Sequence, residues 1–106
     1  MPPEGVARCR AAWARLVGRE TCVVHGDPNP RNIRMTADRV ALIDWDEAHV
    51  DVPDLDLVLP HNAAGLDDDT HDAAAQASAA WEAAVCWDPS GADTFAVKRL
   101  AEVRAV

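Results

Sequence analysis

The sequence predicts an α+β domain in which four helices pack around a short β-hairpin and the strand that precedes it. Three observations support this fold class. Apolar residues recur at helical spacing near the N terminus, two short apolar runs flank a polar turn, and a long Ala-rich stretch fills much of the C-terminal half. The 106 residues contain no internal repeat or low-complexity linker, so we expect residues 1–106 to form a single domain.

The N-terminal segment predicts an amphipathic helix, which Gly18 ends with a left-handed stop. Its apolar residues recur three or four positions apart and should face the core: Val6, Cys9, Trp13, Leu16 and Val17. Residues 21–24 are short and β-branched, which predicts a strand. The strand runs into residues 25–30, where two prolines and a glycine exclude regular structure, so an ordered loop should follow.

Residues 33–35 and 40–43 are apolar runs separated by four polar or small residues, the pattern of a β-hairpin. This hairpin would deliver Asp44, Trp45 and Asp46 to its exit. Pro53 fits the first position of a short helix that continues through Leu59, and Pro60 should stop or kink this helix.

Two further helices are predicted in the C-terminal half. The first begins with the acids near Asp67 and continues through the Ala-rich stretch to Trp87, because Ala is a strong helix former and acids favour a helix N terminus. The second spans residues 93–104 and should pack through four apolar side chains: Phe95, Val97, Leu100 and Val103.

The charge balance excludes some classes of function. The formal net charge of −8 makes a nucleic-acid-binding protein improbable. No run approaches the ~18 apolar residues of a membrane span, and charged residues occupy the N-terminal positions where a signal peptide would be apolar. We therefore expect a cytoplasmic protein. Ala supplies much of its apolar content and buries little area, so the core should be thin and self-association or a partner surface is expected.

Residues 36–72 are strongly acidic, with Arg39 as their one basic residue. The acids from Asp67 to Asp72 are explained by capping of a helix. Asp44 and Asp46 are different, because an apolar strand delivers them beside a loop that contributes its own Asp and Asn.

The composite motif of the chain is H-G-D at residues 25–27, then Asn32, then D-W-D at residues 44–46. Phosphoryl transfer needs a carboxylate that orients and deprotonates a hydroxyl, an amide oxygen on Mg²⁺, and a second carboxylate that joins the metal to the phosphates. Asp27, Asn32 and Asp44 supply these groups in that order. A two-metal hydrolase built on the same carboxylates is a weaker alternative, because it gives Asn32 no role.

At these residues the chain resembles the aminoglycoside phosphotransferase family of kinase-like small-molecule phosphotransferases. The resemblance covers residues 23–59, and D-V-P-D-L-D-L at residues 51–57 is similar to the D-P-x-x-D-L segment of the family. It implies the mostly helical large lobe of a protein-kinase-like fold, with the catalytic loop and metal acids on a short hairpin. The cofactors implied are Mg²⁺ and ATP or another nucleoside triphosphate.

The resemblance also implies a role for each site residue. Asp27 would be the catalytic base, and His25 would belong to the catalytic loop, where we prefer an orienting role because no nucleophile is paired with it. Asn32 and Asp44 would bind the metal and its nucleotide, and Asp46 matches the second metal acid of the family. Asp56 looks like the buried acid that supports the catalytic loop.

A kinase-like enzyme also needs a nucleotide lobe with a Gly-rich cover and a phosphate-binding lysine. The one lysine here is Lys98, far beyond the metal acids. We therefore expect a truncated, C-terminal catalytic lobe, with the N-terminal nucleotide lobe absent or supplied in trans. Two hypotheses follow. In the first, the chain belongs to a phosphotransferase that acts on a hydroxyl of a small molecule, and the acidic region is compatible with a cationic acceptor. In the second, the chain is a non-catalytic remnant that serves as an interaction or Mg²⁺-binding module.

Overall fold

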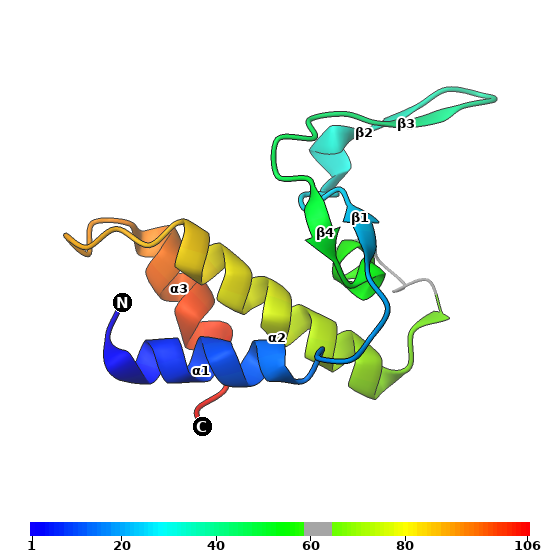
Figure 1. Ribbon diagram of the computed structural model, residues 1–106. Helices are drawn as coiled ribbons and strands as arrows, with labels where there is room; N and C mark the ends of the chain where they lie inside the picture. The colour runs from blue at the N-terminus through cyan, green and yellow to red at the C-terminus, as the bar shows by residue number, and fades with distance from the viewer. Residues whose placement is uncertain (59–64) are drawn as a thin grey trace. The chain divides into compact units, whose positions relative to one another are not determined.

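The computed structural model describes residues 1–58 and 65–106 (Figure 1). These residues form three α-helices and two antiparallel two-stranded sheets, in agreement with the predicted α+β class. They divide into two compact units, one comprising Met1–Gly18 with Asp72–Val106 and the other Arg19–His71. None of the helices in the described ranges is long and apolar enough to cross a membrane.

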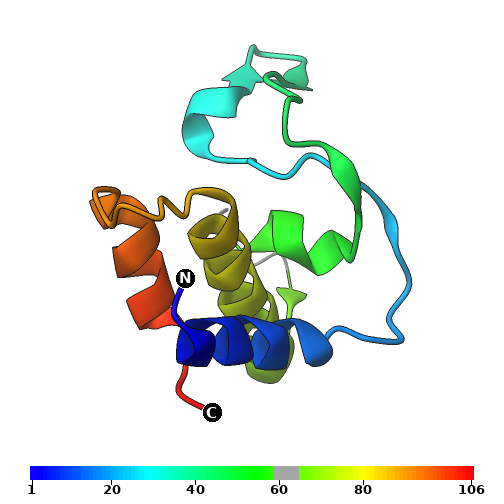
Figure 2. The same cartoon turned by 60° about the vertical axis from the view of Figure 1, so that its left-hand side comes forward.

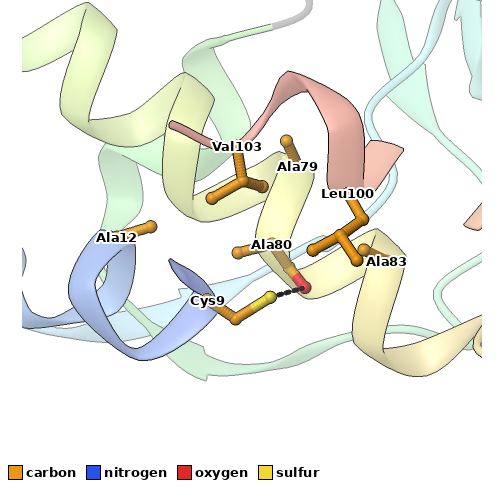
Figure 3. Close-up of a cluster of buried hydrophobic side chains, with 7 residues drawn as sticks. All are labelled: Cys9, Ala12, Ala79, Ala80, Ala83, Leu100 and Val103. Carbon is orange, nitrogen blue, oxygen red and sulfur yellow. Dashed lines mark hydrogen bonds between the residues drawn. The ribbon is translucent and has the colours of Figure 1, made fainter. Parts of the chain in front are cut away.

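The first unit is helical and has an Ala-rich core. Helix α1 spans Pro3–Ala14, α2 spans Asp68–Val85 and α3 spans Thr94–Glu102, and the part of α2 in this unit packs with α1 and α3 (Figures 1 and 2). Small side chains let helix axes approach closely, so the apolar contact is made largely by methyl groups. Figure 3 shows the buried cluster: Cys9, Ala12, Ala79, Ala80, Ala83, Leu100 and Val103.

Cys9 lies within this cluster, where its thiol faces the carbonyl oxygen of Ala80 at 3.8 Å (Figure 3). Burial raises the pKa of the Cys9 thiol. The thiol therefore behaves as a small apolar group of the core.

Several residues that we expected to lie in the core of these helices are exposed. Helix α1 ends at Ala14, and Val17 is 83% exposed instead of buried. In α3 the side chains of Phe95 and Val97 are exposed, while Ala96 is buried beside Leu100. The reasons differ. Val17 lies beyond the end of α1, so the helical spacing no longer places it on the buried face. In α3, Ala96 occupies the buried face, which leaves Phe95 and Val97 on the exposed side of the helix.

The predicted acidic start of the long helix is confirmed. The Asp67 carboxylate accepts hydrogen bonds from the main-chain N–H of Thr70 at 2.8 Å and from its hydroxyl at 3.1 Å. These bonds lower the pKa of Asp67. Helix α3 has the same kind of cap, since Asp93 accepts the N–H groups of Phe95 and Ala96.

The second unit contains the sheets. Strands β2 (Ile33–Met35) and β3 (Val40–Leu42) form the predicted hairpin, with Ile33 opposite Leu42. Strand β1 (Cys22–Val24) pairs instead with β4 (His49–Asp51), a strand that the sequence did not predict (Figure 1). Strand β4 consists of one apolar residue between a histidine and an aspartate. Because three such residues show no alternation of apolar and polar side chains, the sequence does not indicate a strand here.

Two 3₁₀-helices complete this unit. Helix η1 spans Pro30–Asn32 and leads directly into β2. Helix η2 spans Pro53–Leu57, where a short helix beginning at Pro53 was predicted. The predicted end of that helix, at Leu59 and Pro60, lies outside the described residues.

Candidate active site

The loop that follows β1 is anchored by a carboxylate from η2. Asp56 accepts the main-chain N–H of His25 at 2.7 Å and that of Gly26 at 3.1 Å, one on each oxygen. These amides lie where the strand has ended, so they need acceptors other than a neighbouring strand. Asp56 therefore lies under the loop, in the place that the family resemblance assigned to it.

The His25 side chain is 1% exposed, and both of its ring nitrogens are occupied. Nε2 lies 2.7 Å from the carbonyl oxygen of Ile43, and Nδ1 lies 3.1 Å from the main-chain nitrogen of Asp27. Because a carbonyl only accepts and an N–H only donates, the ring carries its hydrogen on Nε2 and accepts through Nδ1. The ring also contacts Trp45, with centroids 4.6 Å apart. His25 thus ties the loop to the exit of the hairpin.

The Asp27 carboxylate is held by two amide side chains from its own loop. Asn29 donates to Oδ1 at 2.7 Å, and Asn32 donates to Oδ2 at 3.1 Å. The same Asn32 amide donates to the main-chain oxygen of Asp27 at 2.8 Å. Asp27 is therefore fixed at its backbone and at both carboxylate oxygens.

Asn32 also connects the loop to the hairpin. Its side chain is buried, and its main-chain oxygen accepts the N–H of Ile43 at 2.9 Å. Ile43 is consequently bound on both sides, through its N–H to Asn32 and through its carbonyl oxygen to His25. The position at which the chain enters Asp44 is thus set by two residues of the loop.

Asp44 has a left-handed backbone, with φ of 59°. Among residues with side chains, Asp is one of the few that tolerate this conformation. The carboxylates of Asp44 and Asp46 are exposed, and within the described residues neither is hydrogen-bonded to Asp27 or Asn32. Between them, Trp45 donates from Nε1 to the carbonyl oxygen of Leu42 at 2.9 Å. The structure thus joins His25, Asp27 and Asn32 directly, and it connects the two acids to them through backbone and ring contacts.

Gly26 brings the loop against the turn that follows the two acids. Its φ is +90°, and a Cβ atom at this position would lie 2.4 Å from the main-chain oxygen of Glu47. Both the conformation and the close approach require glycine. Sequence reasoning missed the contact with Glu47, because a main-chain contact leaves no signal in residue type.

Sequence reasoning also missed the part played by Asn29. Its own Oδ1 accepts the N–H of Arg31 at 2.9 Å and so caps η1, while its Nδ2 holds Asp27. The pair Asn29-Pro30 carries a signal that could have found the cap, since Asn favours the N-cap and Pro the first helical position.

The donor set is suited to Mg²⁺. Within residues 1–58 and 65–106, no three His, Cys, Asp or Glu side chains gather closely enough to hold a metal by themselves. Mg²⁺ does not require such a cage, since it usually binds one or two carboxylates and takes its other ligands from water and phosphate. The Asn32 amide turns its nitrogen to Asp27, so its oxygen Oδ1 is the atom that could bind a metal ion, and Asp44 has an exposed carboxylate. Both are the hard oxygen donors that this ion prefers.

Comparison with known proteins places this arrangement in a family. No curated protein and no solved structure gives a significant match to the chain. The model of the phosphotransferase enzyme family (APH) matches residues 3–98, which include all the loop, hairpin and acid residues described above. The chain therefore belongs to the phosphotransferase enzyme family, as the resemblance of its motifs to the aminoglycoside phosphotransferases predicted.

Proposed function

We propose that the chain carries the catalytic loop of an ATP-dependent phosphotransferase that acts on a hydroxyl group of a small molecule. The observation that carries this proposal is the Asp27 carboxylate, which receives one amide hydrogen bond on each oxygen. A carboxylate can accept about four hydrogen bonds, so both oxygens retain capacity for a substrate hydroxyl. Family membership supports the same type of reaction.

In this proposal Asp27 orients the acceptor hydroxyl and takes its proton as the hydroxyl oxygen attacks the terminal phosphoryl group of the nucleotide. The bond from that phosphorus to the bridging oxygen breaks, and the nucleoside diphosphate leaves. Asn29 and Asn32 keep the carboxylate in one orientation, which lowers the entropy that must be lost on reaching a reactive geometry. His25 acts through Asp27 as a positioning residue, because both of its ring nitrogens are occupied by the main chain.

Asn32 and Asp44 are the residues that would hold Mg²⁺ together with the nucleotide, and Asp46 is the third oxygen ligand that we assign. When bound, Mg²⁺ neutralises the charge that develops on the phosphoryl oxygens. The left-handed backbone of Asp44 supports this assignment, since unusual backbone conformations cluster at functional sites.

We extend the proposal to the partners of the chain. The acidic segment that follows the hairpin favours a cationic acceptor, since charges of one sign attract ligands of the other. A phosphate-binding lysine is not found near the metal acids, so we propose that a nucleotide lobe from another segment or molecule completes the site. The setting that fits this chemistry is the cytoplasm.

A two-step NMR titration of the full ¹⁵N-labelled chain tests the proposed function. Mg²⁺ is added first and ATP second, and the expected result is a saturable shift of the amide signals near Asn32 and Asp44. Asp44→Ala should remove the response. Asp38→Ala is the matched control, because it removes the same charge from the exposed hairpin turn, where its carboxylate contacts Thr36.

Asp27→Asn separates the base from the metal ligands, because it should leave the response to Mg²⁺ and ATP intact. A response that survives in Asp44→Ala would contradict the assigned metal ligand. The absence of any shift at millimolar Mg²⁺ and ATP, in a chain with a dispersed spectrum, would overturn the proposed function and favour the non-catalytic module.

A further inference from the structure

The helical unit contains a cavity of about 250 Å³ that three arginines line. Arg8 and Arg15 come from α1 and its C-terminal cap, and Arg104 comes from the segment that follows α3. Small apolar side chains, Ala12 and Val103 among them, form part of its wall. A concave site with low-dielectric walls focuses the field of such charges.

Main-chain carbonyl groups hold Arg8 in place. Its Nη2 donates to the carbonyl oxygen of Leu100 at 2.7 Å, and its Nε donates to that of Val103 at 2.8 Å. These carbonyls lie at the C-terminal end of α3, where a positive charge is favourable. Arg8 is therefore ordered before any ligand arrives, and its charge has no carboxylate partner among these contacts.

Arg15 and Arg104 are ordered by one shared carboxylate. Arg15 donates to Asp72 at 2.8 Å, and Arg104 binds both oxygens of the same group, with Nη1 at 2.7 Å from Oδ2. Hydrogen bonds from the two guanidinium groups lower the pKa of Asp72 to about 2, so this carboxylate is charged at neutral pH. Asp72 thus orders the side chains of two of the three arginines.

Gln76 fixes the remaining wall. Its Nε2 donates to the main-chain oxygen of Glu102 at 3.0 Å, and its Oε1 accepts the main-chain N–H of Arg104 at 2.8 Å. The segment that carries Arg104 is thereby clamped to α2. A site ordered in this way loses little entropy when a ligand binds.

We propose that this cavity binds a small oxyanion, a phosphate or a carboxylate group, through Arg8, Arg15 and Arg104. Guanidinium groups present forked donors that match the oxygens of both groups. Three arginines line this one cavity although the chain as a whole has a net charge of −8. Basic groups gathered in a concave site attract anions. The proposal concerns the helical unit and is independent of the proposed phosphotransferase function.

The test is an NMR titration of the full chain, at constant ionic strength, with inorganic phosphate in one arm and acetate in the other. The expected result is a saturable shift of the Ala12 and Val103 amides and of the arginine Nε–H signals. Arg104→Gln should weaken binding by roughly tenfold or more, because it removes hydrogen bonds to a charged group. Arg15→Gln gives a second, independent variant.

Arg10→Gln is the matched control, because Arg10 lies on α1, is exposed and does not line this cavity. It should leave the affinity unchanged. Saturable binding of phosphate or acetate that depends on Arg104 or Arg15 supports the proposal. The anion with the lower dissociation constant shows whether the site prefers a phosphate or a carboxylate group. The proposal would be overturned if neither anion binds. It would also be overturned if Arg10→Gln reduces the shifts as much as Arg104→Gln does, or if an equal concentration of chloride produces the same shifts.

Discussion

The carboxylate of Asp56 accepts the main-chain N–H of His25 at 2.7 Å, although the two residues are 31 positions apart. Between them lie the loop, the hairpin and the acid pair, so this bond closes the segment that contains all the predicted catalytic and metal-binding residues. Asp56 on η2 is therefore one of the groups that order the loop. Four predictions follow from these contacts and from those of the helical unit.

The first prediction concerns Asp56. Asp56→Asn removes the charge and one acceptor oxygen from beneath two amides, and a hydrogen bond to a charged group contributes about 1.5–3 kcal/mol. Hydrogen exchange at the His25 and Gly26 amides should therefore accelerate by roughly tenfold to a hundredfold. The control is Asp54→Asn on the same 3₁₀-helix, which removes an ion pair with Arg19 and should leave these two amides unchanged. Equal acceleration in both variants would contradict an anchoring role for Asp56.

The second prediction compares two glycines with nearly the same backbone angle. Gly18 has φ of +88° and open space where a Cβ would lie, whereas at Gly26, with φ of +90°, a Cβ would meet the main chain of Glu47. Gly18→Ala should cost about 1–2 kcal/mol of unfolding free energy through backbone strain alone. Gly26→Ala should cost about 1–3 kcal/mol more, because of the steric contact. Urea denaturation measures both, and equal losses would mean that the turn at Glu47 moves away freely.

The third prediction is the tautomer of His25. The geometry requires a hydrogen on Nε2, which donates to Ile43, and a lone pair on Nδ1, which accepts the N–H of Asp27. Long-range ¹H–¹⁵N correlation spectra distinguish the two ring nitrogens directly. A neutral ring with its hydrogen on Nδ1 would break both contacts and would remove the basis for His25 as the residue that positions the loop.

Residue type alone predicted several parts of the unit that holds the site. Apolar runs around a polar turn predicted the hairpin, and the motifs of residues 25–57 predicted the phosphotransferase family. Strand β4 could not be predicted, because three residues with one apolar side chain carry no periodicity. The contact of Gly26 with Glu47 is made by the main chain, so no residue pattern indicates it.

In the helical unit, periodicity predicted the helices but misplaced part of the buried face. Val17 was expected inside but lies beyond the end of α1 at Ala14. In α3, Phe95 is the larger side chain and was expected inside, yet Ala96 is the buried residue. Hydrophobicity favours the larger side chain, whereas the close approach of two helices selects the smaller one. That approach depends on the partner helix, which the local sequence does not specify.

The fourth prediction is a dependence of stability on pH through Asp72. Its pKa is lowered to about 2 in the folded chain by hydrogen bonds from Arg104 and Arg15, against an ordinary value of 3.8. A carboxyl group whose pKa is lower in the folded state stabilises the fold above its unfolded pKa, and this contribution disappears as the pH falls through the folded value. Asp72→Asn should therefore lower the thermal midpoint at neutral pH, and the difference from the natural chain should shrink between about pH 5 and pH 2. Because all three side chains are partly exposed, added salt should reduce the difference as well. A difference in midpoint that stays constant from neutral pH to about pH 2 would show that Asp72 stabilises the helical unit without its charge.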